Sequence, residues 1–400
     1  MIIQPRTWGF VCTTAHPAGC AANVREAIAA TERLGRRDDG PRRVLVIGAS
    51  SGYGLAVRIA AAFGFGAATL GVFREKPARA RKPGSAGWYH AAALQQALHG
   101  AGLAGASLQG DAFAHATKAQ AIDLIRRELG GPVDLVIHSL AAPARTLPDS
   151  GETVRTVLKP IGVPFHGTSI DTDADRLAAV TVEPASEQEV ADTVTVMGGE
   201  DWRVWIETLA DADLLAPDAR TLAFSYLGPE LTWPIYRDGT IGRAKADLEH
   251  TASRLNRQHG RDDFARVAVL KSIVTQSSAA IPVIPLYLSV VRRVLREKGL
   301  QEGAIEQQNR LFRDFLYRAD GHAPALDGQG RLRLDDRELS SAVQEACMAL
   351  WSRITDANLG TLTDYPGYQR DFLRVFGFAR DDVDYAVDVD PTVDFDCTIA

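Results

Sequence analysis

The sequence predicts an α/β protein with a doubly wound parallel sheet, an inserted segment and a helical C-terminal part. Strand-like apolar runs alternate with helical patterns over residues 41–144, and the alternation returns over residues 220–300. A glycine-rich turn joins the first of these strands to a helix, as in Rossmann-like folds. The chain has 400 residues, 46% of them hydrophobic, which is enough for a large core.

The N-terminal region precedes this alternation. Residues 8–13 favour a short strand, and residues 21–34 favour an amphipathic helix. Cys12, His16 and Cys20 between them have a spacing typical of metal ligands. A tetrahedral site would need a fourth ligand, and no neighbouring pair of cysteines or histidines supplies one. We therefore expect a structural loop here and no metal.

The first strand of the sheet and the turn after it are the centre of the prediction. Val44–Ile47 is a short buried strand, and glycines at 48, 52 and 54 lead into a helix over Leu55–Phe63 that Gly64 would end. The spacing is that of short-chain dehydrogenases and their relatives. Glycine lets the backbone approach a pyrophosphate, and the helix N-terminus meets its charge. We interpret the turn as a dinucleotide site.

A carboxylate follows the second strand, Ala67–Phe73. A ribose ligand is expected ~20 residues beyond the glycine turn, and Glu75 lies at that distance from Gly54. A carboxylate there accepts both ribose hydroxyls and repels a 2′-phosphate, so NADH is the predicted cofactor. Arg74 beside it is the residue type that accommodates such a phosphate. A solvated Arg74–Glu75 charge pair is the non-functional alternative.

Two further strands complete this half of the sheet. Residues 106–108 form the third, and Asp111 after it either holds the adenine amino group or caps the next helix. Val133–Leu140 forms the fourth, and its last residues line the crevice where such sheets bind ligands. His138 lies on this buried strand and is expected to be a packed core residue.

Residues 145–219 break the rhythm of strands and helices. Short strands are predicted near 154–158 and 178–182, and helices near 186–197 and 201–209. We interpret this stretch as an insertion that builds a wall of the substrate site.

The alternation resumes with a fifth strand, Thr221–Tyr226, which places Tyr226 at the mouth of the crevice. Tyr236 and Lys245 follow, nine residues apart. On one regular helix they would be about half a turn out of phase. Both face the same site only if the helix begins between them. The sequence permits such a start, because caps and flexible backbone are supplied by Asp238, Gly239, Thr240 and Gly242.

The sixth strand, residues 267–273, ends in Val274–Gln276. A helix after it carries a basic cluster of Arg292, Arg293, Arg296 and Lys298. The cluster is either a docking surface for an acidic carrier or an ordinary solvated face. Residues 301–378 are predicted to be mostly helical, and residues 381–400 are acidic and predicted to end loosely.

Composition excludes several classes of partner. The net charge of −6 argues against nucleic acid or an anionic membrane surface. The most apolar stretch, residues 54–73, is interrupted by Arg58 and glycines, so it is not a membrane span. The four scattered cysteines suit a reducing cytoplasm, and the N-terminus has no signal-peptide core.

The chain resembles the trans-2-enoyl-thioester reductases of the FabV type, which include the trans-2-enoyl-CoA reductases. The tyrosine–lysine pair with eight residues between its members is the most specific element, because related reductases use shorter spacings. The resemblance covers nearly the whole chain and is carried by five further motifs: Gly9–Thr14, Gly48–Tyr53, Gly110–Phe113, Ala191–Gly199 and Leu231–Tyr236.

The resemblance implies NADH-dependent reduction of the 2,3 double bond of an enoyl thioester, the last step of each fatty-acid elongation cycle. It implies that Tyr236 acts as the acid with Lys245, and that Tyr226 contacts the substrate. The substrate would be carried on acyl carrier protein or CoA, and we expect a monomer. The implied NADH site comprises Gly48, Ala49, Ser50, Ser51, Gly52, Tyr53, Arg74, Glu75, Asp111, Ala112, Ser139, Leu140, Lys245, Val274, Thr275 and Gln276.

Two other functions use the same sheet. A carbonyl-reducing dehydrogenase of the short-chain type would carry a tyrosine and a lysine four residues apart on one helix, and no such pair follows the fifth strand. A catalytically silent NAD-binding regulator would have no need of the pair. NADH oxidation with crotonyl-CoA distinguishes it from an enzyme.

We expect one elaborated domain. Its parts are an N-terminal strand and helix at 1–40, a dinucleotide-binding core at 41–144 and 220–300, a substrate-side insertion at 145–219 and a helical extension at 301–400.

Overall fold

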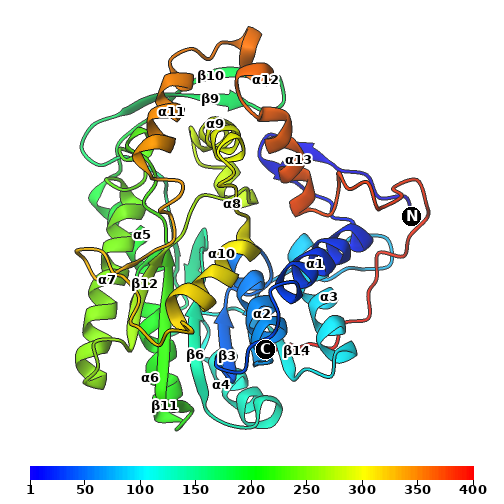
Figure 1. Cartoon of the computed structure of the whole chain (residues 1–400), viewed down its shortest axis with the longest axis vertical. Helices are drawn as coiled ribbons and strands as arrows, with labels where there is room; N and C mark the ends of the chain where they lie inside the picture. The colour runs from blue at the N-terminus through cyan, green and yellow to red at the C-terminus, as the bar shows by residue number, and fades with distance from the viewer.

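The computed structural model describes residues 1–400, and one eight-stranded sheet runs through its centre (Figure 1). All neighbouring strands in it are parallel, in the order β13-β12-β11-β6-β3-β4-β5-β14. The strands are β3 (Arg43–Ile47), β4 (Ala68–Phe73), β5 (Gly105–Gln109), β6 (Val133–His138), β11 (Leu215–Ser225), β12 (Ala265–Val269), β13 (Leu332–Arg333) and β14 (Thr398–Ile399). The predicted doubly wound sheet is confirmed. Its order reverses between β3 and β6, where such folds bind ligands.

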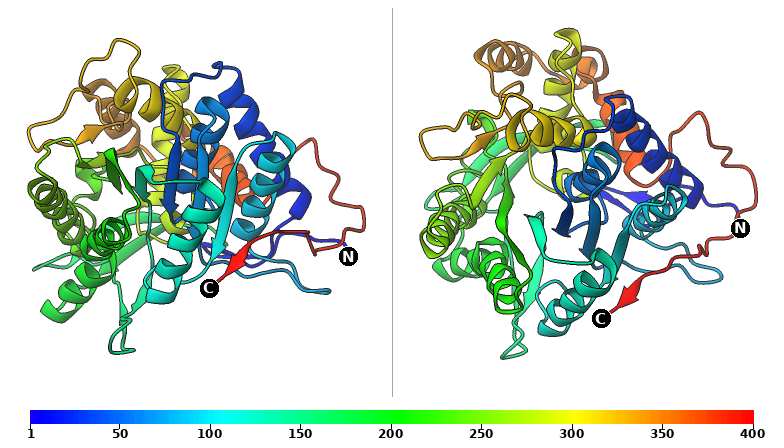
Figure 2. Two further views of the ribbon diagram at one scale, coloured as in Figure 1. Left: turned by 90° about the horizontal axis from the view of Figure 1, so that it is seen from below. Right: turned by 60° about the horizontal axis from the view of Figure 1, so that its bottom comes forward.

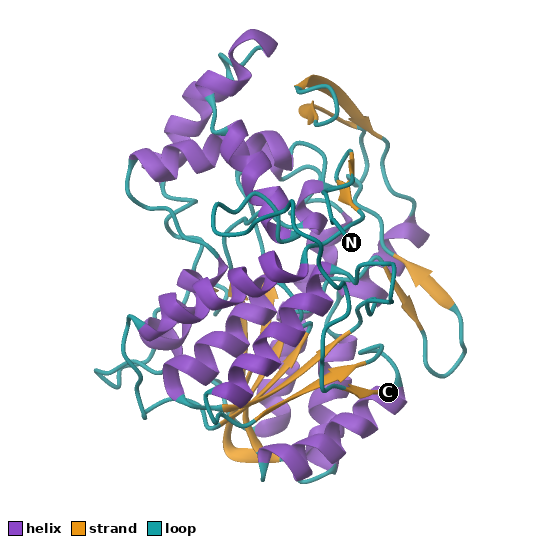
Figure 3. Cartoon of the chain, turned by 90° about the vertical axis from the view of Figure 1, so that its right-hand side faces the viewer, coloured by secondary structure: helices purple, strands orange, loops and turns teal.

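Helices cover both faces of the sheet, as Figure 3 shows. Side chains of β3 alternate: Val44 and Val46 pack on one face and Leu45 and Ile47 on the other. The first face is covered by α2 (Gly52–Phe65), α3 (Ala86–Gly100) and α10 (Ala304–Arg310), with α1 (Pro17–Glu32) outside them. The second face is covered by α4 (His115–Leu124), α6 (Glu200–Asp211) and α7 (Thr240–His259).

The remaining elements lie mainly beyond the carboxyl ends of the strands (Figure 1). Antiparallel hairpins are formed by β7 with β8 and by β9 with β10. Their bounds, with those of the other helices, are β7 (Ala144–Thr146), β8 (Thr153–Arg155), β9 (Phe165–Asp171), β10 (Arg176–Val182), α5 (Glu187–Met197), α8 (Gln276–Ala279), α9 (Ile284–Glu297), α11 (Ser341–Trp351), α12 (Leu359–Leu362) and α13 (Tyr365–Val375).

The N-terminal strand was predicted wrongly. Residues 7–12 form a hairpin of β1 (Thr7–Trp8) and β2 (Val11–Cys12), because Gly9 takes a positive φ of +52° and turns the chain back. The helix after it begins at Pro17, since the side chain of His16 accepts a hydrogen bond from the Gly19 amide. His16 is thus a helix cap, and Cys12 and Cys20 are buried beside it.

Other boundaries move by a few residues. The helix after the glycine turn ends at Phe65, with Gly66 at φ +73° as its cap, and not at Gly64. Gly64 lies inside the helix and packs against Thr31, which explains why a glycine stands there. β11 is longer than predicted and begins at Leu215. β12 is shorter and ends at Val269, where the chain leaves the sheet.

The C-terminal region is not only helical. β13 adds a strand at one edge of the sheet, and β14 adds the last strand at the other. Figure 2 shows the final residues, in red, returning to the sheet, where Thr398 pairs with Leu108. The prediction of a loose end is therefore wrong. Two-residue strands carry no periodicity that a sequence could reveal.

None of the helices combines the length and apolar character that crossing a bilayer would require.

Candidate functional site

The glycine turn after β3 is a tight cradle of backbone. A Cβ added at Gly48 would lie 2.3 Å from the carbonyl oxygen of Ser139, so β3 and β6 approach closely at their carboxyl ends. A Cβ added at Gly54 would lie 1.9 Å from the carbonyl oxygen of Gly48. Helix α2 begins at Gly52, and no side chain caps its first amides. The turn thus leaves backbone N–H groups available to an anion at a helix N-terminus.

Glu75 is held next to this turn by several hydrogen bonds. Ser50 Oγ donates to Glu75 Oε1 at 2.7 Å, and the hydroxyl of Ser85 donates to the other oxygen. Gln109 accepts from the Glu75 amide at 2.9 Å and donates to its carbonyl at 2.7 Å. A Cβ on Gly87 would lie 2.0 Å from Glu75 Oε1. The carboxylate therefore lies between the glycine turn and the start of α3.

Arg74 points to a different partner. Its guanidinium donates to Asp111 Oδ2 at 3.0 Å, across the ends of β4 and β5. Asp111 Oδ1 accepts from the amide of Phe113 at 3.1 Å. Since α4 begins at His115 with Ala114 as its cap, Asp111 caps a turn and not the helix. The Arg74–Glu75 pair proposed as an alternative is not formed, and the adenine role of Asp111 stays a prediction.

A buried charge network lies behind Ala112, and sequence reasoning missed it. Lys118 Nζ donates to the carbonyls of Ala112 at 2.8 Å and Phe113 at 3.1 Å. It also pairs with Asp201 at 2.8 Å, and both side chains are only 3% exposed. Burial lowers the pKa of Lys118, whereas the nearby charge of Asp201 opposes that shift. His138 is buried as predicted, 3.6 Å from Asp201.

Tyr236 and Lys245 are separated by a helix start, as predicted. Tyr236 lies on the turn after the short 3₁₀ helix Glu230–Thr232, and Lys245 lies in the first two turns of α7. The backbone is tightly folded at this start, because a Cβ on Gly242 would lie 1.6 Å from the carbonyl oxygen of Arg237. The two side chains are thereby free of the half-turn offset that a continuous helix would impose.

The electrostatics of the pair differ between its members. Burial raises the pKa of Tyr236 above its ordinary value, and its hydroxyl has no hydrogen-bond partner within the chain. Burial lowers the pKa of Lys245 to about 8. Lys245 Nζ donates to the carbonyl of Phe224, at the end of β11, at 3.1 Å. The ring of Phe224 lies edge-on to that of Tyr53 at 6.1 Å, which links the lysine to the glycine turn.

Tyr226 is beside Tyr236, with the two rings edge-on and their centroids 5.1 Å apart. The hydroxyl of Tyr226 donates to Glu338 Oε1 at 3.1 Å. Burial and the nearby carboxylate of Glu338 both raise the pKa of Tyr226 well above its ordinary value. Sequence reasoning missed Glu338, because 112 residues separate it from Tyr226.

The segment Val274–Gln276 also reaches the glycine turn. A Cβ on Gly52 would lie 3.9 Å from the methyl group of Thr275. The hydroxyl of Thr275 accepts from the Ser278 amide and caps α8. The structure therefore brings the predicted residues of the glycine turn, Glu75, Ser139 and Thr275 together at the carboxyl ends of the strands.

The basic cluster on α9 is engaged within the chain. Arg292 and Arg296 both pair with Asp364, at 2.7 and 2.8 Å. Arg293 donates to the carbonyl of Thr361 at 2.6 Å and pairs with Glu297 at 2.8 Å. These arginines attach α9 to the region of α12 and α13. The docking surface considered from the sequence is not supported, because three of its four cations have intramolecular partners.

Three family models match the chain. The trans-2-enoyl-CoA reductase catalytic region matches residues 82–317. The NAD(P)H binding domain of trans-2-enoyl-CoA reductase matches residues 2–80. A model described as the enoyl reductase FAD binding domain matches residues 326–389.

Relatives and solved structures agree over the full length. The enoyl-[acyl-carrier-protein] reductase [NADH] of Xanthomonas campestris pv. campestris strain 8004 is 58% identical over 398 residues, 99% of each chain. That of Pseudomonas putida strain W619 is 58% identical, again over 99% of each chain. The crystal structure of Treponema denticola trans-2-enoyl-CoA reductase in complex with NAD has a TM-score of 0.94 and 44% identity, covering 98% of this chain and 99% of that one.

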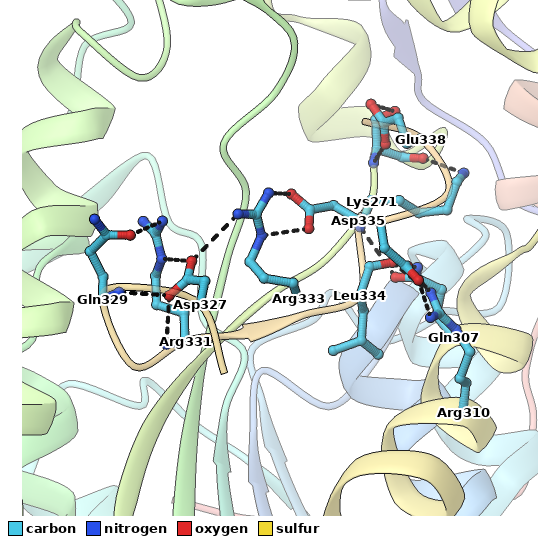
Figure 4. A network of polar contacts seen from close by, with 12 residues as sticks. Lys271, Gln307, Arg310, Asp327, Gln329, Arg331, Arg333, Leu334, Asp335 and Glu338 are labelled. Carbon is cyan, nitrogen blue, oxygen red and sulfur yellow. Dashed lines mark hydrogen bonds and ion pairs between the residues drawn. The ribbon is translucent and has the colours of Figure 1, made fainter. Parts of the chain in front are cut away.

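Residues 326–389 contain no second dinucleotide-binding unit of the kind seen after β3. Their one strand, β13, has two residues and is followed by no glycine turn into a helix like that after β3. Asp327 is engaged by Arg331 at 2.8 Å and Asp335 by Arg333 at 2.8 Å (Figure 4). Glu338 is engaged by Tyr226. These carboxylates thus bind partners within the chain: two stabilise the segment itself, and Glu338 binds a tyrosine of the candidate site.

Proposed function

The chain belongs to the trans-2-enoyl-CoA reductase family, and on that premise we propose that it reduces the 2,3 double bond of trans-2-enoyl thioesters with NADH. The observation that carries the proposal is the placement of Tyr236 on a turn and Lys245 in the helix after it. A phenol and an ammonium would thereby lie at one end of the sheet, next to the dinucleotide cradle.

The cradle after β3 fits the pyrophosphate of NADH, since a side chain at Gly48 or Gly54 would collide with backbone. Glu75 would accept the adenosine ribose hydroxyls, and its charge disfavours a 2′-phosphate. When bound, NADH supplies the hydride that reaches the β-carbon of the enoyl thioester. The residues that would hold it are those of the cradle and the strand ends around it: Gly48, Ala49, Ser50, Ser51, Gly52, Tyr53, Arg74, Glu75, Asp111, Ala112, Ser139, Leu140, Lys245, Val274, Thr275 and Gln276.

Tyr236 would stabilise the thioester oxygen as that oxygen gains negative charge. A hydrogen-bond donor aimed at the developing oxyanion lowers the barrier. The hydroxyl of Tyr236 suits this role, because no group of the chain takes its proton. Tyr226, whose ring contacts that of Tyr236, would contact the substrate beside it.

Lys245 would bind the nicotinamide ribose and favour the phenolate of Tyr236. With a pKa of about 8 it carries its charge at neutral pH. An ammonium near a phenol stabilises the anionic form of that phenol.

The acyl carrier, the oligomeric state and the cellular compartment belong to the same proposal. The acyl group would be carried on acyl carrier protein or CoA, with residues 145–199 as a wall of its site. The predicted insertion is shorter than 145–219, because α6 covers the sheet and β11 belongs to it. We propose that the chain acts as a monomer in the cytoplasm. Its four cysteines are all free, as a reducing compartment favours.

The test is NADH oxidation at 340 nm with two CoA thioesters, crotonyl-CoA and acetoacetyl-CoA. We expect loss of absorbance with crotonyl-CoA only, and saturated butyryl-CoA as product. Oxidation with acetoacetyl-CoA alone would favour a carbonyl reductase, and none with either thioester would favour a silent NAD-binding protein. Repeating the assay with crotonyl-acyl-carrier protein then identifies the preferred carrier.

A further inference from the structure

A fully buried carboxylate lies behind Tyr226. Glu338 belongs to the segment that follows β13, and it is 0% exposed. Its Oε1 accepts hydrogen bonds from the hydroxyls of Tyr226 at 3.1 Å and Tyr287 at 2.8 Å. Ser272 donates twice, from Oγ to Oε1 at 2.9 Å and from its amide to Oε2 at 2.6 Å.

These contacts satisfy the carboxylate without water. A carboxylate that leaves water needs hydrogen-bond donors at its lone pairs, and both oxygens of Glu338 have them. Lys271 is also close, since its Nζ donates to the carbonyl oxygen of Ser272 at 2.7 Å. Burial lowers the pKa of Lys271, and the nearby carboxylate of Glu338 opposes that shift. Glu338 therefore acts as an acceptor that fixes the side chains around it.

The contact with Glu338 decides what Tyr226 can do. A phenol hydroxyl can donate one hydrogen bond, and that of Tyr226 donates it to Glu338 Oε1. Its hydroxyl oxygen is then left as an acceptor only. Tyr236, 5.1 Å away between ring centroids, has its proton uncommitted. Of the two neighbouring phenols, only Tyr236 can donate to a thioester oxygen without breaking a buried hydrogen bond.

We propose that Glu338 is a positioning residue for the reduction. It holds Tyr226 with its hydroxyl proton turned away from the thioester, so that Tyr236 alone donates there. Through Glu338, the segment matched by the third family model contributes to the site. The inference rests on the roles proposed above for Tyr226 and Tyr236.

The test is a double-mutant cycle between Glu338 and Tyr226. Glu338→Gln keeps the length of the side chain but replaces one carboxylate oxygen by an NH₂ group. That group is a hydrogen-bond donor, and it would face the hydroxyl and amide donors that now bind the carboxylate. We expect kcat to fall about 10-fold while the KM for NADH stays within about 2-fold. In a Tyr226→Phe background the same change should lower kcat by less than about 2-fold, because the group through which Glu338 acts is gone.

Asp335→Asn is the matched control. Asp335 is also 0% exposed, lies three residues before Glu338, and pairs with Arg333 at 2.8 Å (Figure 4). The hydroxyls of Tyr226 and Tyr287 donate to Glu338 and not to Asp335. Its substitution should lower the thermal midpoint and leave kcat within about 2-fold in both backgrounds. A general loss of packing in the segment would instead lower kcat in the control as well.

Results that contradict the role of Glu338 can be told apart from results that contradict the role of Tyr236. Equal losses of kcat on Glu338→Gln in the wild-type and Tyr226→Phe backgrounds would overturn the inference. That result does not touch the role of Tyr236, which Tyr236→Phe tests separately. If Glu338→Gln does not fold, Tyr287→Phe removes another donor to the same carboxylate. Its effect on kcat must likewise vanish in the Tyr226→Phe background.

Discussion

The hydroxyl of Ser50 donates to the carboxylate of Glu75 at 2.7 Å, which ties the glycine turn after β3 to the end of β4. In the proposed binding mode, Glu75 would meet a 2′-phosphate on the adenosine ribose. Two like charges at ~4 Å repel by ~1 to ~4 kcal/mol at effective dielectric constants of ~80 to ~20. We expect a preference for NADH over NADPH of roughly tenfold to several hundredfold, from that repulsion.

Glu75→Ala should move the ratio of kcat/KM for NADH and NADPH toward NADPH. Arg74→Ala is the companion variant, because it removes a cation that could accommodate a 2′-phosphate and should move the ratio toward NADH, the opposite direction. Equal kcat/KM values for the two cofactors in the wild-type enzyme would contradict the assignment of Glu75.

A second prediction concerns Gly87, in the first turn of α3. Gly87→Ala puts a Cβ 2.0 Å from Glu75 Oε1, so the carboxylate must move. We expect weaker NADH binding and a loss of about 1–3 kcal/mol in the free energy of unfolding from overpacking. Isothermal titration with NADH and urea unfolding measure the two effects.

Gly100→Ala is the matched control on the same helix, since no atom lies within 4 Å of its added Cβ. This change should leave NADH binding intact. Similar losses of NADH affinity in both variants would show that the affinity depends on α3 as a whole and not on the close contact between Gly87 and Glu75.

A third prediction concerns the buried pair of Lys118 and Asp201. Lys118→Met leaves a carboxylate unpaired in the interior, and breaking a buried pair in this way costs about 3–5 kcal/mol. It also releases the carbonyls of Ala112 and Phe113 that Lys118 holds, so the KM for NADH should rise. Urea unfolding and steady-state kinetics are the measurements.

Adding Asp201→Asn to Lys118→Met removes the orphaned charge and should restore part of the stability. It should not restore the KM for NADH, because the carbonyls stay unbound. A Lys118→Met variant with wild-type stability would contradict the role of the pair.

The glycine turn could be predicted from the sequence, and the buried networks could not. Strand β3, its glycines and α2 are adjacent in the chain, so local periodicity and spacing define them. Lys118 and Asp201 meet across 83 residues, and Glu338 reaches Tyr226 across 112. Contacts of that kind depend on how the whole sheet folds, and single residues carry no local sign of them.

The same reasoning explains the missed strands. β13 and β14 consist of two residues each and are defined by their partners at the sheet edges, Val269 and Leu108 among them. The turn between Tyr236 and Lys245 was predictable for the opposite reason. Glycine beside a helical pattern marks a helix start, and Gly239 is the N-cap of α7. Asp238, also predicted as a cap, pairs with Arg237 instead.

A fourth prediction concerns pH. Burial lowers the pKa of Lys245 to about 8, so raising the pH through 8 removes the ammonium from the folded protein. We expect the dissociation constant for NADH to rise over that range. Since the unfolded chain keeps its lysine proton up to about pH 10.4, the contribution of Lys245 to stability rises between pH 8 and that value.

Titrations of NADH binding from pH 6 to about pH 10 check this expectation. Lys245→Met is the control, because its weaker binding should not depend on pH over the same range. A wild-type dissociation constant that stays constant through pH 8 would contradict a ribose contact by the ammonium.

The central claim is that Tyr236 donates to the thioester oxygen. The decisive measurement is single-turnover NADH oxidation by Tyr236→Phe with crotonyl-CoA, with NADH affinity measured in parallel. Loss of a positioned proton donor costs roughly 10²–10⁴-fold in rate, so we predict a fall in that range with NADH affinity unchanged. Near-normal turnover by Tyr236→Phe would contradict the claim and make Tyr226 the acid.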